Sequence, residues 1–425
     1  MSIVGEREML TQRRVIAFFK DALGYTYLGH WKDCEDNSHI EEALLIDWLT
    51  RQGHSDKIIQ KVLFQLSKAA ALGGSTTLYD ANREVYGRLR YGVNVIPEAG
   101  EKAVTVSLVD WQNPDNNDCA VAEEVTVYGV NTKRPDVVLY VNGIALGVLE
   151  LKRSTVSVTE GIRQSLDSQK REFIRAFYTT VQLVLAANET EGLRYGVIET
   201  PEKYWLRWKE AEAHPDAGDN PLLRELSQLC GKARLLEIVH DFMVFDAGIK
   251  KTCRHNQYFG VQAAQHQVRC REGGVLWHTQ GSGKSLIMVW LAKWIREHVT
   301  NGRVLTITDR TELDEQIEKV FKGVSEDIYR ATSGADLVNV LGGGEEWLVC
   351  SLIHKFGASE EGDVDAFVDD IRKHLPKRFP RARRSVRVRG RMPSHSVGQA
   401  ARGDEGIGAG CNADRLHRHA AAQKR

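Results

Sequence analysis

The segment Arg134–Arg153, RPDVVLYVNGIALGVLELKR, constrains the fold of this chain more than any other. Two apolar runs flank Asn142-Gly143, a dipeptide that strongly favours the turn of a β-hairpin. Runs this apolar indicate strands that are buried within a sheet. Helical periodicity precedes the hairpin over residues 10–70 and follows it over residues 157–186. Helix, strands and helix together predict one α/β domain that ends near Lys209.

Charged residues at the ends of these buried strands predict a metal-dependent nuclease site. Asp136 precedes the first strand, and Glu150 and Lys152 end the second. Two carboxylates can hold Mg²⁺, while a lysine on the same face positions the attacking water and offsets phosphate charge. The alternative is an exposed polar row on an edge strand, with Asp136 capping a turn. The apolar sequence on both sides favours the metal site.

The length of the hairpin loop sets a condition on this site. A two-residue turn would pair Val141 with Ile144 and direct Asp136 away from Glu150. An odd loop, such as one with Gly143 in a bulge, would place both carboxylates and the lysine on one face. We therefore expect the odd loop.

A second motif, HTQGSGKS, predicts a phosphate-binding loop. It follows the run GVLW, which is expected to be a strand, and precedes the apolar helical run SLIMVWLAKWI. Gly281 and Gly283 would let backbone N–H groups approach phosphates, Lys284 would reach the β and γ phosphates, and Ser285 would bind the metal. His278 replaces the first glycine of the usual pattern, so the identification depends on the strand–loop–helix context. Further strands RVLTI and WLVCSL, with the helix ELDEQIEKVF between them, predict a parallel sheet.

Charge and cysteine content exclude several classes of protein. Lys and Arg number 57 and Asp and Glu number 57, so the formal charge is zero and gives no general argument for nucleic-acid or membrane partners. The seven cysteines are scattered and form no C-x-x-C pair, which favours reduced thiols over disulfides or zinc. No run is apolar enough for a membrane span, and the N-terminus lacks the apolar core of a signal peptide. We expect a cytoplasmic protein without membrane contact.

The hairpin, the GVLWHTQGSGKS loop and the following VLTITDRTELDEQI together resemble one family, the R subunits of type I restriction enzymes. These subunits cut DNA after ATP-driven translocation. The resemblance covers approximately residues 10–379. It implies an α/β chain with a PD-(D/E)xK-type nuclease domain followed by the first half of a RecA-like P-loop helicase domain. It also implies ATP and Mg²⁺ as cofactors, with double-stranded DNA and the methylation (M) and specificity (S) subunits as partners.

The same resemblance assigns site residues and domain limits. Asp136, Glu150 and Lys152 would be the nuclease residues, with Gln164 as a further candidate. Family members often carry a tyrosine four residues after that glutamine, where this chain has Ser168. Asp309 and Arg310 would lie in the next motor motif. The nucleotide site, with Gln257 as adenine contact and Ser285 as metal ligand, would comprise Gln257, His278, Thr279, Gln280, Gly281, Ser282, Gly283, Lys284 and Ser285. The expected parts are a nuclease domain (1–209), a linker and connecting helix (210–250), a partial motor domain (251–379) and a disordered tail (380–425).

The tail departs from the family. It has no Phe, Trp or Tyr after residue 380, and it lacks the D-E-x-H and T-G-T-P segments that the resemblance implies. However, Gly390–Ser394 can be encoded by codons that read D-E-C-H-R one nucleotide further on, and Asp414–Ala421 by codons that allow I-G-F-T-G-T-P. The hypothesis is an out-of-frame tail that begins near Phe379, which would leave the motor inactive. Two alternatives stay open, namely a stand-alone Mg²⁺-dependent nuclease with regulatory nucleotide binding, and an inert remnant.

Overall fold

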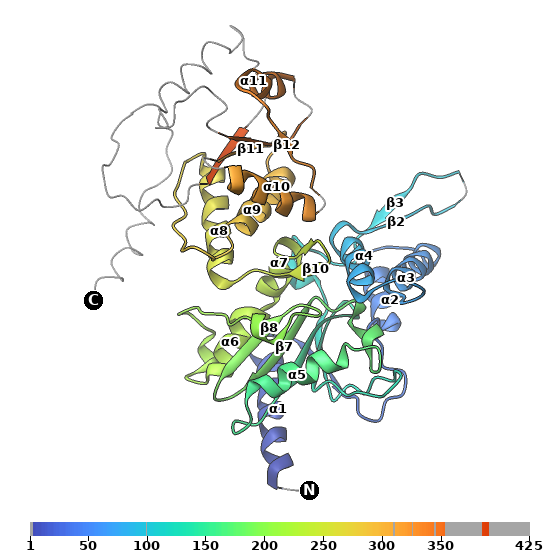
Figure 1. The fold of residues 1–425 in the computed structure, drawn as a ribbon. Helices are drawn as coiled ribbons and strands as arrows, with labels where there is room; N and C mark the ends of the chain where they lie inside the picture. The colour runs from blue at the N-terminus through green and yellow to red at the C-terminus, as the bar shows by residue number, and fades with distance from the viewer. Residues whose placement is uncertain are drawn as a thin grey trace. The chain divides into compact units, whose positions relative to one another are not determined.

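The computed structural model describes residues 3–98, 100–308, 311–324, 326–343, 346–352 and 385–390. The chain divides into two compact units, residues 1–258 with 323–325, and residues 259–322 with those from 326 onward (Figure 1). Both units combine helices with strands, which confirms the α/β class predicted from the sequence.

The first unit contains a six-stranded sheet, two small two-stranded sheets and surrounding helices. Its helices are α1 (Ile3–Asp21), α2 (Glu42–Arg51), α3 (Asp56–Ala70), α4 (Leu78–Tyr91), α5 (Val158–Ser168), α6 (Pro221–Cys230), α7 (Lys232–Asp241) and the start of α8 (His255–Cys270). Its short 3₁₀ helices are η1 (Pro114–Asn116), η2 (Arg175–Thr179), η3 (Glu202–Tyr204) and η4 (Pro215–Ala217). Its strands are β1 (Thr26–His30), β2 (Val93–Val95), β3 (Val104–Val106), β4 (Cys119–Glu123), β5 (Val137–Val141), β6 (Ile144–Leu151), β7 (Leu183–Asn188), β8 (Gly192–Gly196), β9 (Val244–Asp246) and β10 (Ile249–Lys251).

The large sheet has the order β1-β4-β5-β6-β7-β8, so the predicted hairpin β5–β6 lies at its centre. The pairs β1–β4 and β6–β7 are parallel, and the other neighbouring strands are antiparallel. Every residue of β5 and β6 is buried, which is the burial that their apolar sequence predicts. Helix α5 packs on β6 and β7 (Figure 1).

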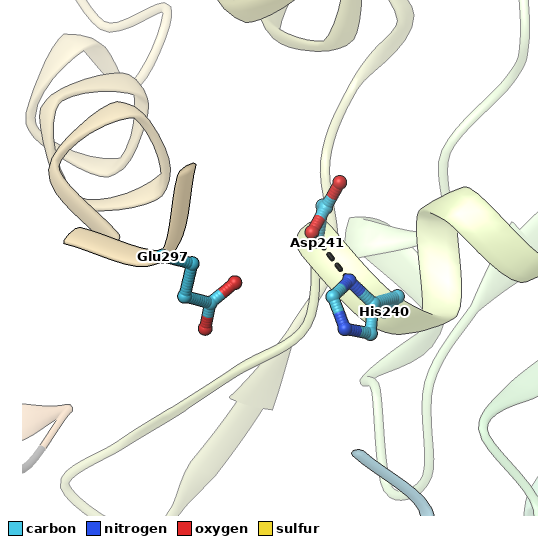
Figure 2. A group of neighbouring side chains, drawn as sticks. All are labelled: His240, Asp241 and Glu297. Atoms are coloured by element: carbon cyan, nitrogen blue, oxygen red, sulfur yellow. Dashed lines mark hydrogen bonds and ion pairs between the residues drawn. The ribbon is translucent and has the colours of Figure 1, made fainter. Parts of the chain in front are cut away.

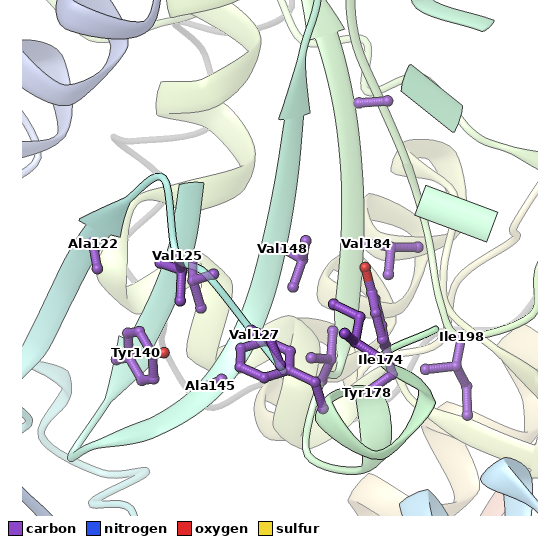
Figure 3. Close-up of a cluster of buried hydrophobic side chains, with 14 of the residues drawn as sticks. Ala122, Val125, Val127, Tyr140, Ala145, Val148, Ile174, Tyr178, Val184 and Ile198 are labelled. Carbon is purple, nitrogen blue, oxygen red and sulfur yellow. The ribbon is translucent and has the colours of Figure 1, made fainter. Parts of the chain in front are cut away.

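One core lies between this sheet and α5 (Figure 3). Strands β5 and β6 contribute Val138, Tyr140 and Val148, and Tyr178 of η2 packs with them. Ala145 and Val148 belong to the same core although they are three residues apart. Since side chains alternate along a regular strand, this spacing requires an irregularity in β6.

Local sequence signals explain where several helices begin. Thr77 and Asp80 form a capping box at the start of α4, in which each side chain accepts from the other residue's backbone N–H. At α6, the Asn220 side chain accepts from two backbone N–H groups, and Pro221 occupies the first helical position. No helix in the described part of the chain has both the length and the apolarity needed to cross a membrane.

The second unit is built on a parallel sheet with the order β12-β13-β11-β14. Its elements are the rest of α8, α9 (Lys284–His298), β11 (Arg303–Thr308), α10 (Thr311–Gly323, which ends in the first unit), β12 (Tyr329–Arg330), α11 (Gly334–Gly343), β13 (Leu348–Leu352) and β14 (Ser385–Gly390). The helices and strands predicted for residues 285–352 are therefore present, and their parallel pairing is confirmed.

Four expectations about the elements are wrong. Strand β1 lies within residues 10–70, and β7 begins within residues 157–186, two stretches expected to be helical throughout. Short apolar runs fit a strand or a helix equally well, which explains both errors. Residues 274–277 form no strand, because this run has no partner strand among the described residues. Residues 385–390 of the expected disordered tail form β14, where Val and Arg alternate with strand periodicity; the rest of 380–425 lies outside the described residues.

Candidate nuclease and nucleotide sites

A β-bulge, rather than an odd loop, sets the register of the β5–β6 hairpin. The turn has two residues, Asn142 and Gly143, with φ of 51° and 80°, and Val141 pairs with Ile144. Between the Tyr140–Ala145 and Leu139–Gly147 pairs the register shifts, so Leu146 is the extra residue. The expected odd loop is wrong, but the bulge supplies the same one-residue correction. Asp136 is therefore brought opposite Glu150, and both carboxylates lie on one face.

Asp136, Glu150 and Lys152 come together at the end of this hairpin. The Oδ2 atom of Asp136 accepts a hydrogen bond of 2.6 Å from the backbone N–H of Leu151. It also lies 3.9 Å from Nζ of Lys152, which donates to the Leu151 carbonyl oxygen at 2.9 Å. Both side chains are about 15% exposed, so the cluster is partly accessible from solvent while its position is fixed.

Glu150 is the buried member of the cluster, with 1% of its surface exposed. Burial raises the pKa of its carboxyl well above the usual value, and the nearby Asp136 raises it further, whereas Lys152 lowers it. Its Oε1 atom has no hydrogen-bond partner among the described residues. A buried carboxylate oxygen without a partner, beside a second carboxylate, is a donor set that suits a hard divalent cation such as Mg²⁺.

Helix α5 covers the cluster and supplies Gln164. The Nε2 atom of Gln164 donates to Oε2 of Glu150 at 2.6 Å, so the structure brings this candidate into the site. Ser168, the residue that departs from the family pattern, instead donates to the Gln164 carbonyl oxygen. Gly161 allows the close approach of the helix, since a Cβ there would lie 3.6 Å from Cβ of Glu150 and 3.3 Å from Cβ of Ala186.

The candidate phosphate-binding loop, residues 278–285, lies in the second unit. Gly281 and Gly283 adopt φ of 76° and 78°, a left-handed backbone that glycine accommodates without strain. Lys284 begins α9, and its Nζ donates to the carbonyl oxygens of His278 and Thr279 at 3.1 and 2.9 Å. The Ser282 hydroxyl donates to the same Thr279 oxygen at 2.8 Å. Gln280 and Thr279 are exposed, and Ser285 lies in the first turn of α9.

The remaining motor candidates have different positions. Gln257 is buried in the first unit, and its Oε1 accepts from the backbone N–H of Arg254 at 2.8 Å. This contact holds the start of α8, whatever other role Gln257 has. Asp309 and Arg310 lie outside the described residues.

Sequence reasoning missed several polar groups of the first unit. Tyr178, which packs in one core with Val148, and Gly161, which lies close to Glu150, come from segments that carry no recognisable motif. At the end of α7, Nδ1 of His240 and Oδ1 of Asp241 form a hydrogen bond of 2.6 Å (Figure 2). Glu297, the third side chain in that figure, belongs to α9 of the second unit and is not assigned to a common site.

Two family models match the chain. Residues 6–203 match the N terminus of type I restriction enzyme R proteins, and residues 256–381 match the SWI2/SNF2 ATPase family. The first match contains Asp136, Glu150, Lys152 and Gln164, and the second contains residues 278–285.

Curated relatives agree with the first match. They include a putative type I restriction enzyme MjaIXP endonuclease subunit of Methanocaldococcus jannaschii, which is 28% identical and aligns with 64% of this chain and 29% of its own length. The type I restriction enzyme HindI endonuclease subunit of Haemophilus influenzae is also 28% identical, over 64% of this chain and 27% of its own length. The SsaAORF53P endonuclease subunit of Staphylococcus saprophyticus is 24% identical, over 63% and 29%. The chain thus spans less than a third of the length of these relatives.

Proposed function

We propose that this chain, which is similar to the N-terminal part of type I restriction enzyme endonuclease subunits, carries the DNA-cleaving site of such an enzyme. In this proposal residues of the first unit form a PD-(D/E)xK-type, Mg²⁺-dependent nuclease, and the second unit is the first RecA-like domain of an ATP-driven DNA translocase. Double-stranded DNA is the substrate. Methylation and specificity subunits would choose the sequence, while this subunit contacts mainly the phosphate backbone.

The observation that carries the proposal is the register of the β5–β6 hairpin. The bulge at Leu146 places Asp136 opposite Glu150, with Lys152 two residues further along the same face. A bulge next to a cluster of charged groups is a feature that folds retain for function, because it redirects side chains at the expense of regular pairing. A purely structural hairpin needs neither the bulge nor the buried Glu150.

Each side chain of the cluster has a distinct proposed part. Asp136 and Glu150 would hold Mg²⁺, which when bound polarises a phosphoryl oxygen and favours a nucleophilic water. Gln164 holds the second oxygen of Glu150 and so orients this carboxylate. Lys152 would orient the attacking water and offset negative charge on the phosphate, since its ammonium group is already held beside Asp136.

DNA cleavage by the assembled enzyme tests the nuclease site. Asp136→Asn, Glu150→Gln and Lys152→Met should each lower Mg²⁺-dependent cleavage by at least about 100-fold. Asp167→Asn is the matched control, because Asp167 is an exposed carboxylate of α5 that pairs with Lys170. Equal cleavage by all three variants and the control would contradict the assignment. Cleavage by the chain alone, without ATP or partner subunits, would instead favour the stand-alone nuclease.

Nucleotide binding tests the proposed motor site. Lys284→Ala should weaken ATP binding by about tenfold or more, because the loop loses the charge that reaches the β and γ phosphates. Lys322→Ala, which removes an exposed α10 lysine paired with Glu318, is the control. A fluorescent ATP analogue can measure both affinities. Equal affinity of the two variants would exclude Lys284 from the site.

A shifted reading frame near Phe379 is the second part of the proposal, and it leaves this product without ATP hydrolysis or translocation. The match to the ATPase family continues to residue 381, close to the proposed shift, which supports the idea. Resequencing the gene across the codons for residues 376–393 tests it. A DNA sequence whose shifted frame does not encode D-E-C-H would rule the shift out.

A further inference from the structure

The buried polar atoms of the first unit that lack a hydrogen-bond partner among the described residues include the hydroxyl of Tyr178 and Oε1 of Glu150. Tyr178 is fully buried and Glu150 almost so. Native proteins leave few such atoms unsatisfied, and those that remain commonly mark a functional site or an ordered water.

The strand register places Glu150 on the sheet face that Tyr178 covers. In the parallel β6–β7 pair, Val148 lies beside Val184, and Glu150 lies beside Ala186. Val148, Val184 and Ala186 pack with Tyr178 in one core, so Glu150 shares the sheet face that Tyr178 covers. Figure 3 shows the Tyr178 ring along this face with its hydroxyl pointing toward Val184. The next pair of residues in that direction is Glu150 and Ala186.

Small residues of α5 face this position. Gly161 brings the helix close to Glu150, and Ser165 and Ser168 follow on the same buried face. Burial, and then the charge of Glu150, raise the pKa of the Tyr178 hydroxyl, while the nearby hydroxyls of Ser168 and Ser165 oppose this rise. The phenol therefore keeps its proton and remains a hydrogen-bond donor.

We propose that Tyr178 is a positioning residue of the nuclease site, whose hydroxyl donates through one buried water to Oε1 of Glu150. The water would hold this carboxylate in the orientation that accepts a metal ion. Buried waters typically make about three hydrogen bonds. Tyr178, Glu150 and the Ser168 hydroxyl provide that number. The inference rests on the proposed nuclease function.

Metal binding without DNA provides the first test. Tyr178→Phe removes one oxygen and keeps the ring, and it should weaken Mn²⁺ binding to the full chain by about 5- to 10-fold in calorimetric titration. Tyr140→Phe is the matched control, because Tyr140 is buried in the same core but its hydroxyl already donates to the Ser38 carbonyl oxygen. An unchanged Mn²⁺ affinity in Tyr178→Phe would overturn the proposal.

A metal-free measurement separates this inference from the function on which it rests. In EDTA, Tyr178→Phe should lower the urea midpoint of the wild-type chain but not that of a Glu150→Leu chain, which has no carboxylate to bond. Equal effects in both backgrounds would overturn the link between Tyr178 and Glu150. If the wild-type chain binds no Mn²⁺ at all, the proposed nuclease function fails, and the urea comparison still decides whether the hydroxyl bonds to Glu150.

Discussion

The β5–β6 hairpin and the GVLWHTQGSGKS loop begin from similar sequences, since in each an apolar run leads into the reactive residues, but their structures differ. Every residue of β5 and β6 is buried, and Glu150 is held by a neighbouring helix. In the loop, Val275 is 86% exposed, Trp277 is 80% exposed, and Lys284 donates to the carbonyl oxygens of His278 and Thr279 in its own loop. The hairpin strands pair with each other, whereas residues 274–277 have no partner strand among the described residues.

The hairpin site is assembled from neighbouring segments of its own unit, whereas residues 274–277 lack a partner strand among the described residues. A two-residue turn pairs β5 with β6 over a short stretch of chain, and α5 follows closely enough to cover the result. A parallel strand needs a neighbour that arrives through a crossover connection. Four predictions test this difference, from the largest expected effect to the smallest.

Packing of α5 on the hairpin gives the largest expected effect. Gly161→Leu would press a side chain against Glu150, Lys152 and Ala186, and a displacement of about 1 Å can cost about 100-fold in rate. DNA cleavage by the assembled enzyme measures it. Gly87→Leu in α4 is the control, because a Cβ at Gly87 meets nothing within 4 Å. If both variants cleave alike, the hairpin is less constrained by α5 than its contacts indicate.

Lys250 is a buried lysine of the first unit, in contrast to Lys284 of the loop. Its Nζ donates to Asn82 Oδ1 at 2.7 Å and to Gln182 Oε1 at 2.6 Å, and burial lowers its pKa well below the usual value. The unfolded chain then binds more protons, so the free energy of unfolding should rise with pH toward 10.5, by up to about 1.4 kcal/mol per pH unit. Urea unfolding at several pH values should show a flatter profile for Lys250→Met than for wild type. An unchanged profile would mean that Lys250 does not titrate in this way.

Two valines compare the apolar runs directly. Val148→Ala should lower the free energy of unfolding of the first unit by about 2 kcal/mol, because two buried methyl groups are lost. Val275→Ala should change stability by less than about 0.5 kcal/mol, because this residue is exposed. Chemical unfolding followed by circular dichroism measures both changes. A comparable loss at Val275 would show that residues 274–277 are packed in solution.

The variant Glu150→Gln tests whether the buried carboxylate lowers the free energy of unfolding. Without metal, Glu150→Gln should raise the free energy of unfolding at neutral pH by about 1 kcal/mol, because burial and Asp136 both disfavour the charged form. A raised pKa means that the carboxylate's contribution falls as pH rises from 4.5 through the folded-state value, and the neutral amide removes that dependence. The exposed Glu101→Gln is the control in the same unfolding assay. A lower free energy of unfolding for Glu150→Gln would instead indicate that the surroundings of Glu150 stabilise its charged form.

Local chemistry made the hairpin and its charged residues predictable from the sequence. Asn142-Gly143 fixed the turn, and Glu150 and Lys152 share a face by strand alternation alone. The irregularity expected in the loop at Gly143 lies instead at Leu146, within β6. Gly147 was the available signal, since an isolated glycine within a strand often marks a bulge.

The features that could not be predicted from the sequence are those that depend on tertiary packing. Tyr178 of η2 packs in the core beside β6, inside a stretch expected to be a helix, and Gly161 matters because α5 passes close to Glu150 there. Strand β7 was missed because LVLAAN fits a buried helix as well as a strand. The run GVLW had the composition of a strand, but strand formation also depends on a partner.

The position of the candidate nuclease residues along the chain also has a consequence for the order of synthesis. The candidate residues Asp136, Glu150, Lys152 and Gln164, and the proposed positioning residue Tyr178, all precede residue 259, where the second unit begins. Domains generally fold as units during translation, with the N-terminal one first. A ribosome therefore completes every one of these candidate nuclease residues before it makes the candidate phosphate-binding loop, so the first unit can fold while the second is still being synthesised.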